Sequence, residues 1–320
     1  MRCFLINCSY QLKVQIYISR FNLICYKKIS VKNKIDPNPT DERQLMGQKK
    51  ELHLERLFSN AVNEPAYRPV FLEELLDSDV YCVGHSQQHI TDDAIHHRQI
   101  KAGEQIFIKS WDDTEFDRII PFFTSLEKMQ LAIDPKESFL RLPARTFMQM
   151  TSGAKLVLNP ESDAVKVFYP VEVQALLDGN FSLDPEEYVY DEEVEVLLSE
   201  PDPYPKYLVQ QLRLYFKQRP EVEAAYLAEM LDTNRDAEPV LVIGLVVQDH
   251  MSHKDLHQLH RQLGQVAFDS LKEDQRSIDL VHLNADDVLD GLESYLLDET
   301  KPFYSAKHDD QRSIFATLFS

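Results

Sequence analysis

The sequence predicts an α+β protein built from two tandem mixed α/β domains. Its 320 residues suit about two domains, and 43% of them are hydrophobic, which is enough to bury a core in each. Apolar runs of strand length alternate with segments of helical periodicity on both sides of an acidic stretch that contains prolines. We therefore divide the chain into a leader at 1–45, a first domain at 46–180, a linker at 181–205 and a second domain at 206–320.

The first domain is predicted to mix helices and strands. Apolar side chains recur at helical spacing from Leu52 to Val62, and Pro65 ends that helix. Gly153 and Gly179 are placed as left-handed caps of two later helices. The further helices are expected at 70–76, 125–133, 144–151 and 171–177, and the strands at 80–83, 106–108, 118–123, 139–142, 155–158 and 167–169.

The second domain is predicted to have the element order α-β-β-α-β-α. A helix ends before Pro220, and two apolar strands at 223–230 and 240–247 form a hairpin. A helix at 253–270, a strand at 278–283 and a helix that contains Leu292 follow. Because the two hairpin strands follow each other without a helix between them, the order favours α+β over a doubly wound fold.

The linker is strongly acidic. Residues 184–202 hold nine acidic side chains and no basic one, and Pro201, Pro203 and Pro205 stiffen its end. It lacks the glycine and the alternating carboxylates of an EF-hand loop, so a solvated linker is favoured over a cation site. Within it, residues 194–198 have the composition of a strand.

The charge balance excludes some classes of partner. With 34 basic and 53 acidic residues the net charge is -19, and such a surface repels nucleic-acid phosphates and anionic membranes. The longest apolar run, residues 240–247, is too short to cross a bilayer as a helix. We expect neither nucleic acid nor a membrane as a partner.

The first 45 residues differ from the rest. They hold eight basic residues against three acidic ones, and three of the four cysteines, but no convincing signal peptide. Our hypothesis is that this segment lies outside the folded protein, as a non-native or disordered leader, and that Met46 is the true start. N-terminal sequencing of the native protein tests this. Without the leader only Cys82 remains, which excludes a disulfide framework and fits a reducing compartment.

The segment at 124–128 carries a possible nucleophile. Ser125 and Lys128 have the S-x-x-K spacing of serine acylases, but the companion tripeptides S-D-N and K-T-G do not occur. The same residues fit the start of a helix, with Thr124 as N-cap and Glu127 completing a capping box. The helix start is therefore favoured over catalysis.

The histidines form two groups. His253 and His257, one turn apart on a predicted helix, are the candidate metal ligands, but Lys254 stands where H-E-x-x-H needs a glutamate. A solvated helix flank that continues to His260 is favoured. The second group is placed in a polar surface loop; its members are His85, His89, His96 and His97.

Other catalytic signatures are missing from the sequence. The eight glycines are too dispersed for a Rossmann or P-loop motif, and G-x-S-x-G is absent. Cys82 lies in an apolar strand and is expected to be inert. We predict no catalytic residue, no cofactor and no metal beyond the weak candidates His253 and His257.

Four segments together resemble a known family. They are EPAYRPVFLEELL at 64–76, IIPFFTSLE at 119–127, PARTFMQMTSG at 143–153 and LVLNP at 156–160. The chain is similar in these segments to the SseB family, the enhanced serine sensitivity proteins of bacteria. The resemblance is clear over about 50–180 and looser beyond. It implies two α+β domains, a cytoplasmic location and a link to tolerance of excess serine, but no reaction and no catalytic residues.

The expected function is that of a non-catalytic interaction or regulatory protein in amino-acid physiology, with an unidentified protein partner. The first alternative is a sensor that binds an amino acid between the domains. The second is a metal-dependent enzyme with an unrecognised histidine site. The sequence leaves the partner and the oligomeric state open.

Overall fold

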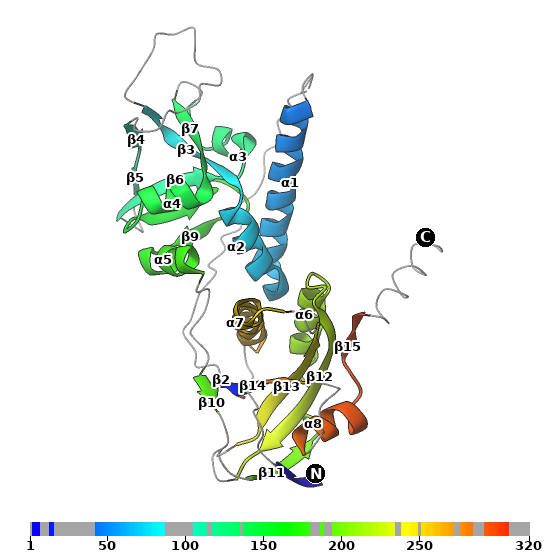
Figure 1. Cartoon of the computed structure of the whole chain (residues 1–320). Helices are drawn as coiled ribbons and strands as arrows, with labels where there is room; N and C mark the ends of the chain where they lie inside the picture. The colour runs from blue at the N-terminus through cyan, green and yellow to red at the C-terminus, as the bar shows by residue number, and fades with distance from the viewer. Residues whose placement is uncertain are drawn as a thin grey trace. The chain divides into compact units, whose positions relative to one another are not determined.

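The computed structural model describes residues 2–6, 13–15, 42–86, 105–113, 117–134, 137–179, 186–188, 194–233, 238–248, 251–271, 276–283 and 291–306. The chain forms two compact units: an N-terminal unit of residues 21–63 and 67–179, and a C-terminal unit of residues 1–20, 64–66 and 180–320. Each unit combines helices with a β-sheet (Figure 1). The predicted α+β class with two tandem mixed domains is confirmed.

The N-terminal unit contains helices and strands close to the predicted ranges. Its helices are α1 (Glu42–Asn63), α2 (Arg68–Leu76), α3 (Leu126–Gln130), α4 (Ala144–Met150) and α5 (Pro170–Asp178). Its strands are β3 (Asp79–Ser86), β4 (Ile106–Ile108), β5 (Trp111–Asp113), β6 (Asp117–Phe123), β7 (Phe139–Pro143), β8 (Lys155–Leu158) and β9 (Lys166–Phe168). Gly179 ends α5 with a left-handed backbone at φ +75°, as the sequence predicts.

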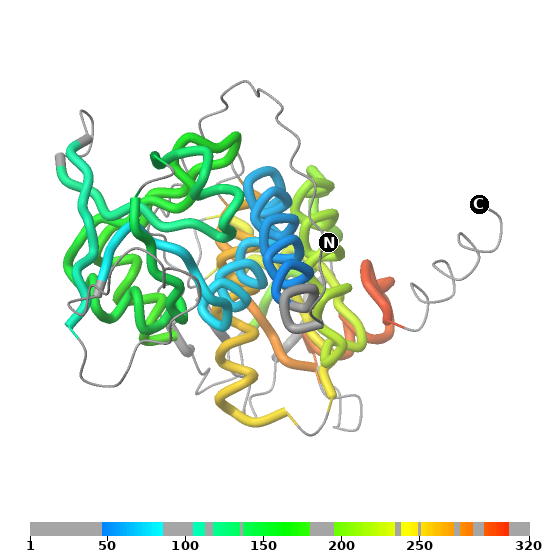
Figure 2. The backbone as a smooth tube through the Cα atoms, turned by 90° about the horizontal axis from the view of Figure 1, so that it is seen from above, coloured from blue at the N-terminus to red at the C-terminus, as the bar shows by residue number. Residues whose placement is uncertain are grey.

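The sheet of this unit has the order β4-β3-β6-β8-β9, with β7 on β3 and β5 on β6. Strands β6 and β8 are parallel, so their carboxyl ends lie at the same edge. Helices α1 and α2 lie side by side in both views (Figures 1 and 2), with the rings of Phe58 and Phe71 stacked at 4.8 Å.

Helices cover both faces of this sheet. Neighbouring residues of a strand point to opposite faces, and Phe122 and Phe123 of β6 are both fully buried. The ring of Phe122 lies 5.1 Å from that of Phe147 in α4, whereas Phe123 packs with Met129 of α3. The apolar end of β6 therefore anchors the segment that follows it, residues 124–130.

The C-terminal unit follows the predicted order α-β-β-α-β-α. This order is α6 (Lys206–Phe216), β12 (Val222–Leu231), β13 (Val240–Val247), α7 (His253–Ser270), β14 (Ile278–His282) and α8 (Leu292–Ser294), which continues as a π-helical turn, Tyr295–Glu299. Shorter strands are β10 (Glu186–Tyr188), β11 (Val194–Ser199) and β15 (Tyr304–Ser305). Strand β11 pairs with β12, so the second half of the predicted linker belongs to this sheet.

Strand β13 is the centre of this sheet. It pairs with β12 on one side and with β14 on the other, and its residues are buried on both faces. Figure 1 shows α6 and α7 on one face and α8 on the other. A Cβ at Gly244 would stand 2.7 Å from Leu283 and 2.9 Å from Leu296, so glycine permits this close packing.

No helix in the described residues is long and apolar enough to cross a membrane.

Two short strands come from the first 45 residues. Strand β1 (Arg2–Ile6) pairs with β11, and β2 (Lys13–Gln15) pairs with β14 and β10. This placement differs from the expected leader outside the fold. The physical reason is that the backbone of β11 offers an unpaired edge to a further strand, which a count of charges does not reveal. The start at Met46 stays a prediction; α1 begins at Glu42.

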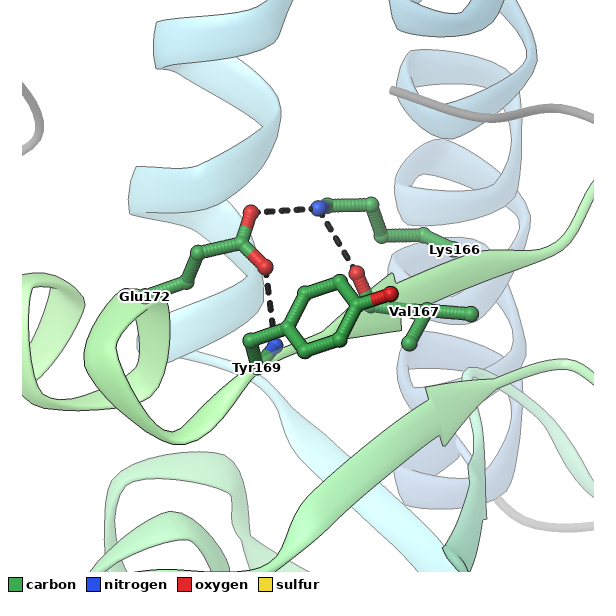
Figure 3. A network of polar contacts seen from close by, with 4 residues as sticks. All are labelled: Lys166, Val167, Tyr169 and Glu172. Carbon is green, nitrogen blue, oxygen red and sulfur yellow. Dashed lines mark hydrogen bonds and ion pairs between the residues drawn. The ribbon is translucent and has the colours of Figure 1, made fainter. Parts of the chain in front are cut away.

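A buried ion pair joins β9 to α5 (Figure 3). The Nζ of Lys166 donates to Oε1 of Glu172 at 2.7 Å and to the carbonyl oxygen of Val167 at 2.8 Å. The other oxygen of Glu172 accepts the backbone N–H of Tyr169 at 2.8 Å, at the start of the helix. The two charged side chains are only 6% and 12% exposed, so each neutralises a charge that burial would otherwise penalise.

Replacing Glu172 by alanine should lower the free energy of unfolding by about 3 kcal/mol, because it leaves a buried ammonium group unpaired. The double variant Lys166→Met/Glu172→Leu should lose less, because it removes both charges together. Chemical denaturation measures both changes.

The exposed pair of Lys109 and Glu137 is the matched control. Its atoms are as close, at 2.6 Å, but the side chains are 51% and 33% exposed. Glu137→Ala should therefore cost about 0.5 kcal/mol. If Glu137→Ala and Glu172→Ala lowered the free energy of unfolding equally, burial would add nothing to the contribution of the Lys166–Glu172 pair.

Candidate functional site

The candidate site lies where the parallel strands β6 and β8 end. Phe122 pairs with Leu158 at the last register position, so the segments that follow, Thr124–Lys128 and Asn159–Ala164, begin side by side. Two of the four sequence segments that carry the family resemblance, 119–127 and 156–160, meet at this edge.

Asn159 joins the two segments through its side chain. Its Oδ1 accepts the backbone N–H of Thr124 at 2.9 Å, and its Nδ2 donates to Oγ1 of Thr124 at 2.9 Å. Its own backbone N–H donates to the carbonyl oxygen of Phe122 at 2.9 Å. Asn159 and Thr124 are 1% and 0% exposed, so these bonds satisfy polar groups that water cannot reach.

Glu55 of α1 extends the network. Its Oε1 accepts the hydroxyl of Thr124 at 3.3 Å and, at a shorter distance, the hydroxyl of Ser125. The hydroxyl of Ser125 also accepts the backbone N–H of Lys128 at 3.2 Å. The carboxylate thereby ties α1 to the segment after β6, and both hydroxyl hydrogens of that segment are engaged.

The predicted capping box at Thr124 is wrong in its detail. Helix α3 begins at Leu126, its N-cap is Ser125, and Glu127 stands too close to the cap to complete a box. The reason is tertiary: Asn159 and Glu55 engage Thr124, which leaves Ser125 as the residue whose oxygen accepts a first-turn N–H. The serine of the S-x-x-K spacing is thus the N-cap of α3.

A hollow of about 590 Å³ opens beside this network. One side is α1, and the other is formed by Lys128 and by the loop after β8. The α1 residues that line it are Lys49, Leu52, His53, Glu55, Arg56, Phe58 and Ser59, and the loop contributes Asn159, Ser162, Asp163 and Ala164. Its volume lies within the range of small-molecule pockets.

The loop after β8 holds two unusual backbone conformations. Asn159 has φ +51° and Glu161 has φ +65°, the left-handed region that costs a non-glycine residue roughly 1 kcal/mol. The hydroxyl of Ser162, which is 6% exposed, has no hydrogen-bond partner among the described residues. An unsatisfied buried hydroxyl beside strained backbone is typical of a site shaped for a ligand.

The predicted metal candidates lie elsewhere, on α7. His253 is exposed and His257 is half-buried on this helix. Within the described residues, no three histidine, cysteine, aspartate or glutamate side chains come together as a set of metal ligands. His85 lies on β3, with its ring stacked 5.1 Å from Phe107, whereas His89, His96, His97 and His250 lie outside the described residues.

His260 departs from the expected solvated flank. It is 2% exposed, and its Nε2 has no hydrogen-bond partner in the described part of the chain; the same holds for Nδ1 of His282 on β14. Burial, followed by the nearby imidazoles of His282 and His257, lowers the pKa of His260 from 6.5 to about 4. The spacing of Leu256, His260 and Leu263 already places His260 on the apolar stripe of the helix, a signal that the sequence interpretation did not use.

Cys82 is buried in β3, as expected. Burial raises the pKa of its thiol to about 12, so the reactive thiolate is not formed near neutral pH.

Comparison with known families gives two matches in tandem. The family model described as the SseB protein N-terminal domain matches residues 54–175, and that of the SseB protein C-terminal domain matches 190–306. The first match includes all four residues of the network, Glu55, Thr124, Ser125 and Asn159.

Two curated proteins are similar along most of their length. Protein SseB of Escherichia coli (strain K12) and Protein SseB of Shigella flexneri are each 30% identical over 256 residues, covering 79% of this chain and 92% of the relative. No solved structure matches the chain.

Asn159→Ala should lower the free energy of unfolding by about 3 kcal/mol, because it leaves the buried N–H of Thr124 unpaired and keeps a Cβ at positive φ. Asn159→Gly loses the same side chain but relieves the backbone, so it should retain about 1 kcal/mol more. Denaturant titration distinguishes them. A glycine variant no more stable than the alanine variant would contradict the assigned conformation.

The lowered pKa of His260 should make stability fall in acid. The unfolded chain takes up a proton near pH 6.5, but the folded chain does so only near pH 4. The free energy of unfolding should therefore decrease as the pH falls from 6.5 to 4, by on the order of 3 kcal/mol from this group.

His260→Leu should flatten that slope, whereas His253→Leu, at an exposed position, should leave it unchanged. Denaturation from pH 7.5 to pH 4 measures it; equal slopes in both variants would refute the prediction.

Proposed function

The chain belongs to the SseB protein family, and we propose that it acts as a non-catalytic binding protein in amino-acid physiology, in the sensitivity to excess serine from which the family takes its name. It would act in the cytoplasm, by stoichiometric association with a protein partner. This is the role expected from the sequence, and the geometry of the N-terminal unit supports it.

The observation that carries the proposal is the network below the hollow. A nucleophilic serine needs a base that takes its proton and a substrate carbonyl within reach of its oxygen. Ser125 donates to Glu55, as a nucleophile donates to its base, but it is 5% exposed and its oxygen accepts the backbone N–H of Lys128, so a substrate carbonyl does not reach that oxygen. The Thr124 hydroxyl is engaged in the same way by Asn159 and Glu55.

The groups that remain accessible at the hollow are suited to contact rather than to chemistry. They include the ammonium and guanidinium groups of Lys49, Lys128 and Arg56 and the apolar side chain of Leu52. Arginine is enriched at interfaces between proteins, and cationic side chains can favour a partner of opposite charge. A binding role therefore accounts for the hollow without any reacting group.

Titrating the amount of protein in the cell separates binding from turnover. In a strain of the source organism whose chromosomal copy is deleted, the chain is expressed from an adjustable promoter and growth is measured against L-serine concentration. Stoichiometric action predicts that the change in serine sensitivity is proportional to the copy number. The full change at about one hundredth of the normal copy number would indicate turnover and overturn the proposal.

Ser125→Ala provides the matched test of catalysis. It should show the same serine sensitivity as the wild type once its folded amount equals that of the wild type, which quantitative immunoblotting establishes. An altered serine sensitivity at an equal folded amount would mean that the hydroxyl takes part in a reaction.

A further inference from the structure

We propose that the hollow beside α1 binds an acidic segment of a partner protein, which places an apolar side chain over Leu52 and its carboxylates on the surrounding cations. The inference rests on the proposed function, because it names the chemistry of the partner. It is carried by four features of the described residues: the charges at the rim, the exposed leucine, the unsatisfied serine and the size of the hollow.

The rim charges are opposite in sign to the chain as a whole. Lys49, Arg56 and Lys128 line the hollow of a protein whose net charge is -19. Among the described residues no acidic side chain pairs with Lys49 or Lys128, and the guanidinium of Arg56 lies 3.3 Å from Nδ1 of His53. Cationic side chains without an acidic partner among the described residues favour an acidic segment of another protein by charge complementarity.

The acidic residues at the hollow cancel this charge only in part. Glu55 accepts the hydroxyls of Thr124 and Ser125, which are neutral, so its negative charge still counts at the hollow. Asp163 is the other acid that lines the hollow, against three cations. The balance at the hollow thus favours an anionic occupant.

An apolar anchor is provided by α1. Leu52 is 70% exposed although it lines the hollow, and the residues three before and four after it are Lys49 and Arg56, so all three share one stripe of the helix. The deeper wall contains Phe58, which is 3% exposed. This arrangement suits a segment in which an apolar side chain stands between acidic ones.

Ser162 offers a hydrogen bond to such a segment. It lines the hollow, and its hydroxyl has no partner in the described part of the chain. The strained backbone at Asn159 and Glu161 holds the loop that carries it. A carbonyl or carboxylate oxygen of the bound segment would satisfy the hydroxyl and relieve the cost of leaving it unpaired.

The size of the hollow favours a segment over a free amino acid. A volume of about 590 Å³ is in the range that holds drug-sized ligands, and serine would occupy only a small part of it. The walls from α1 and from the loop after β8 also leave the hollow open, as a peptide requires.

An unbiased peptide selection tests the proposal. A random peptide library displayed on phage is selected on the full chain, and binding of the recovered peptides is measured by fluorescence anisotropy at 50 mM and 300 mM salt. The expected peptides carry aspartate or glutamate on both sides of an apolar residue, and they bind more weakly at high salt.

Two pairs of variants locate the binding site. Lys49→Glu/Arg56→Glu should weaken binding at least tenfold, whereas Arg118→Glu/Arg145→Glu, which changes the net charge equally at other exposed positions of the unit, should change it less than twofold. Leu52→Ser should weaken binding about fivefold, whereas Val171→Ser, at an apolar position that is 73% exposed, should not. Circular dichroism and thermal unfolding establish that each variant is folded.

Recovered peptides without acidic enrichment, or peptides that bind the Lys49→Glu/Arg56→Glu variant as well as the wild type, would overturn the inference. So would competition of the peptides by free L-serine at equal affinity, because the hollow would then be an amino-acid site. The two proposals fail separately: growth in proportion to copy number without acidic peptides refutes only this inference, and turnover at low copy number refutes the proposed function.

Discussion

The geometry of the candidate site depends on one side chain, Asn159. Strands β6 and β8 run in parallel and end together, and the polypeptide after each strand has to turn away with its first backbone groups buried. Asn159 satisfies those groups by bonding to the backbone N–H and the hydroxyl of Thr124, while its own N–H bonds to Phe122. The left-handed backbone that this requires, φ +51°, is tolerated better by asparagine than by most residues. These hydrogen bonds between Asn159 and the segment after β6 are called the Asn159 bridge below. The bridge fixes the positions of Ser125, Lys128 and Ser162.

The bridge also explains how polar residues that resemble catalytic groups serve the fold. Glu55, Thr124, Ser125 and Asn159 come from three separate segments, and each is held by the others in a buried network, where unsatisfied groups would cost free energy. What is left at the surface is a hollow with cationic and apolar walls. The hydroxyls of Thr124 and Ser125 are held inside the network, and the side chains that line the hollow come largely from α1. The buried network thus holds in place α1 and the loop after β8, which form the walls of the hollow.

Local patterns predict much of this fold, and tertiary contacts account for the rest. Strand β13 and helix α7 have the predicted bounds, because a long apolar run and a long helical period admit few interpretations. Strand β5, three residues with two aspartates, exists through its pairing with β6 and has no signal of its own. The sequence pattern predicts Thr124 as the cap of α3, whereas the structure has Ser125. The bond from Asn159, 35 residues away, decides between them, and neither the parallel pairing of β6 with β8 nor the position of Glu55 is visible in the sequence.

Amide hydrogen exchange at Thr124 tests the central claim most directly. The N–H of this residue lies outside the sheet ladder, immediately after β6, where an unbridged turn exchanges within seconds to minutes. If Asn159 holds it as described, it should exchange as slowly as the ladder amides of β6 and β8, through opening of the whole unit. Exchange of the Thr124 amide at the rate of an exposed loop, with the neighbouring ladder amides still protected, would contradict the bridge and the site built on it.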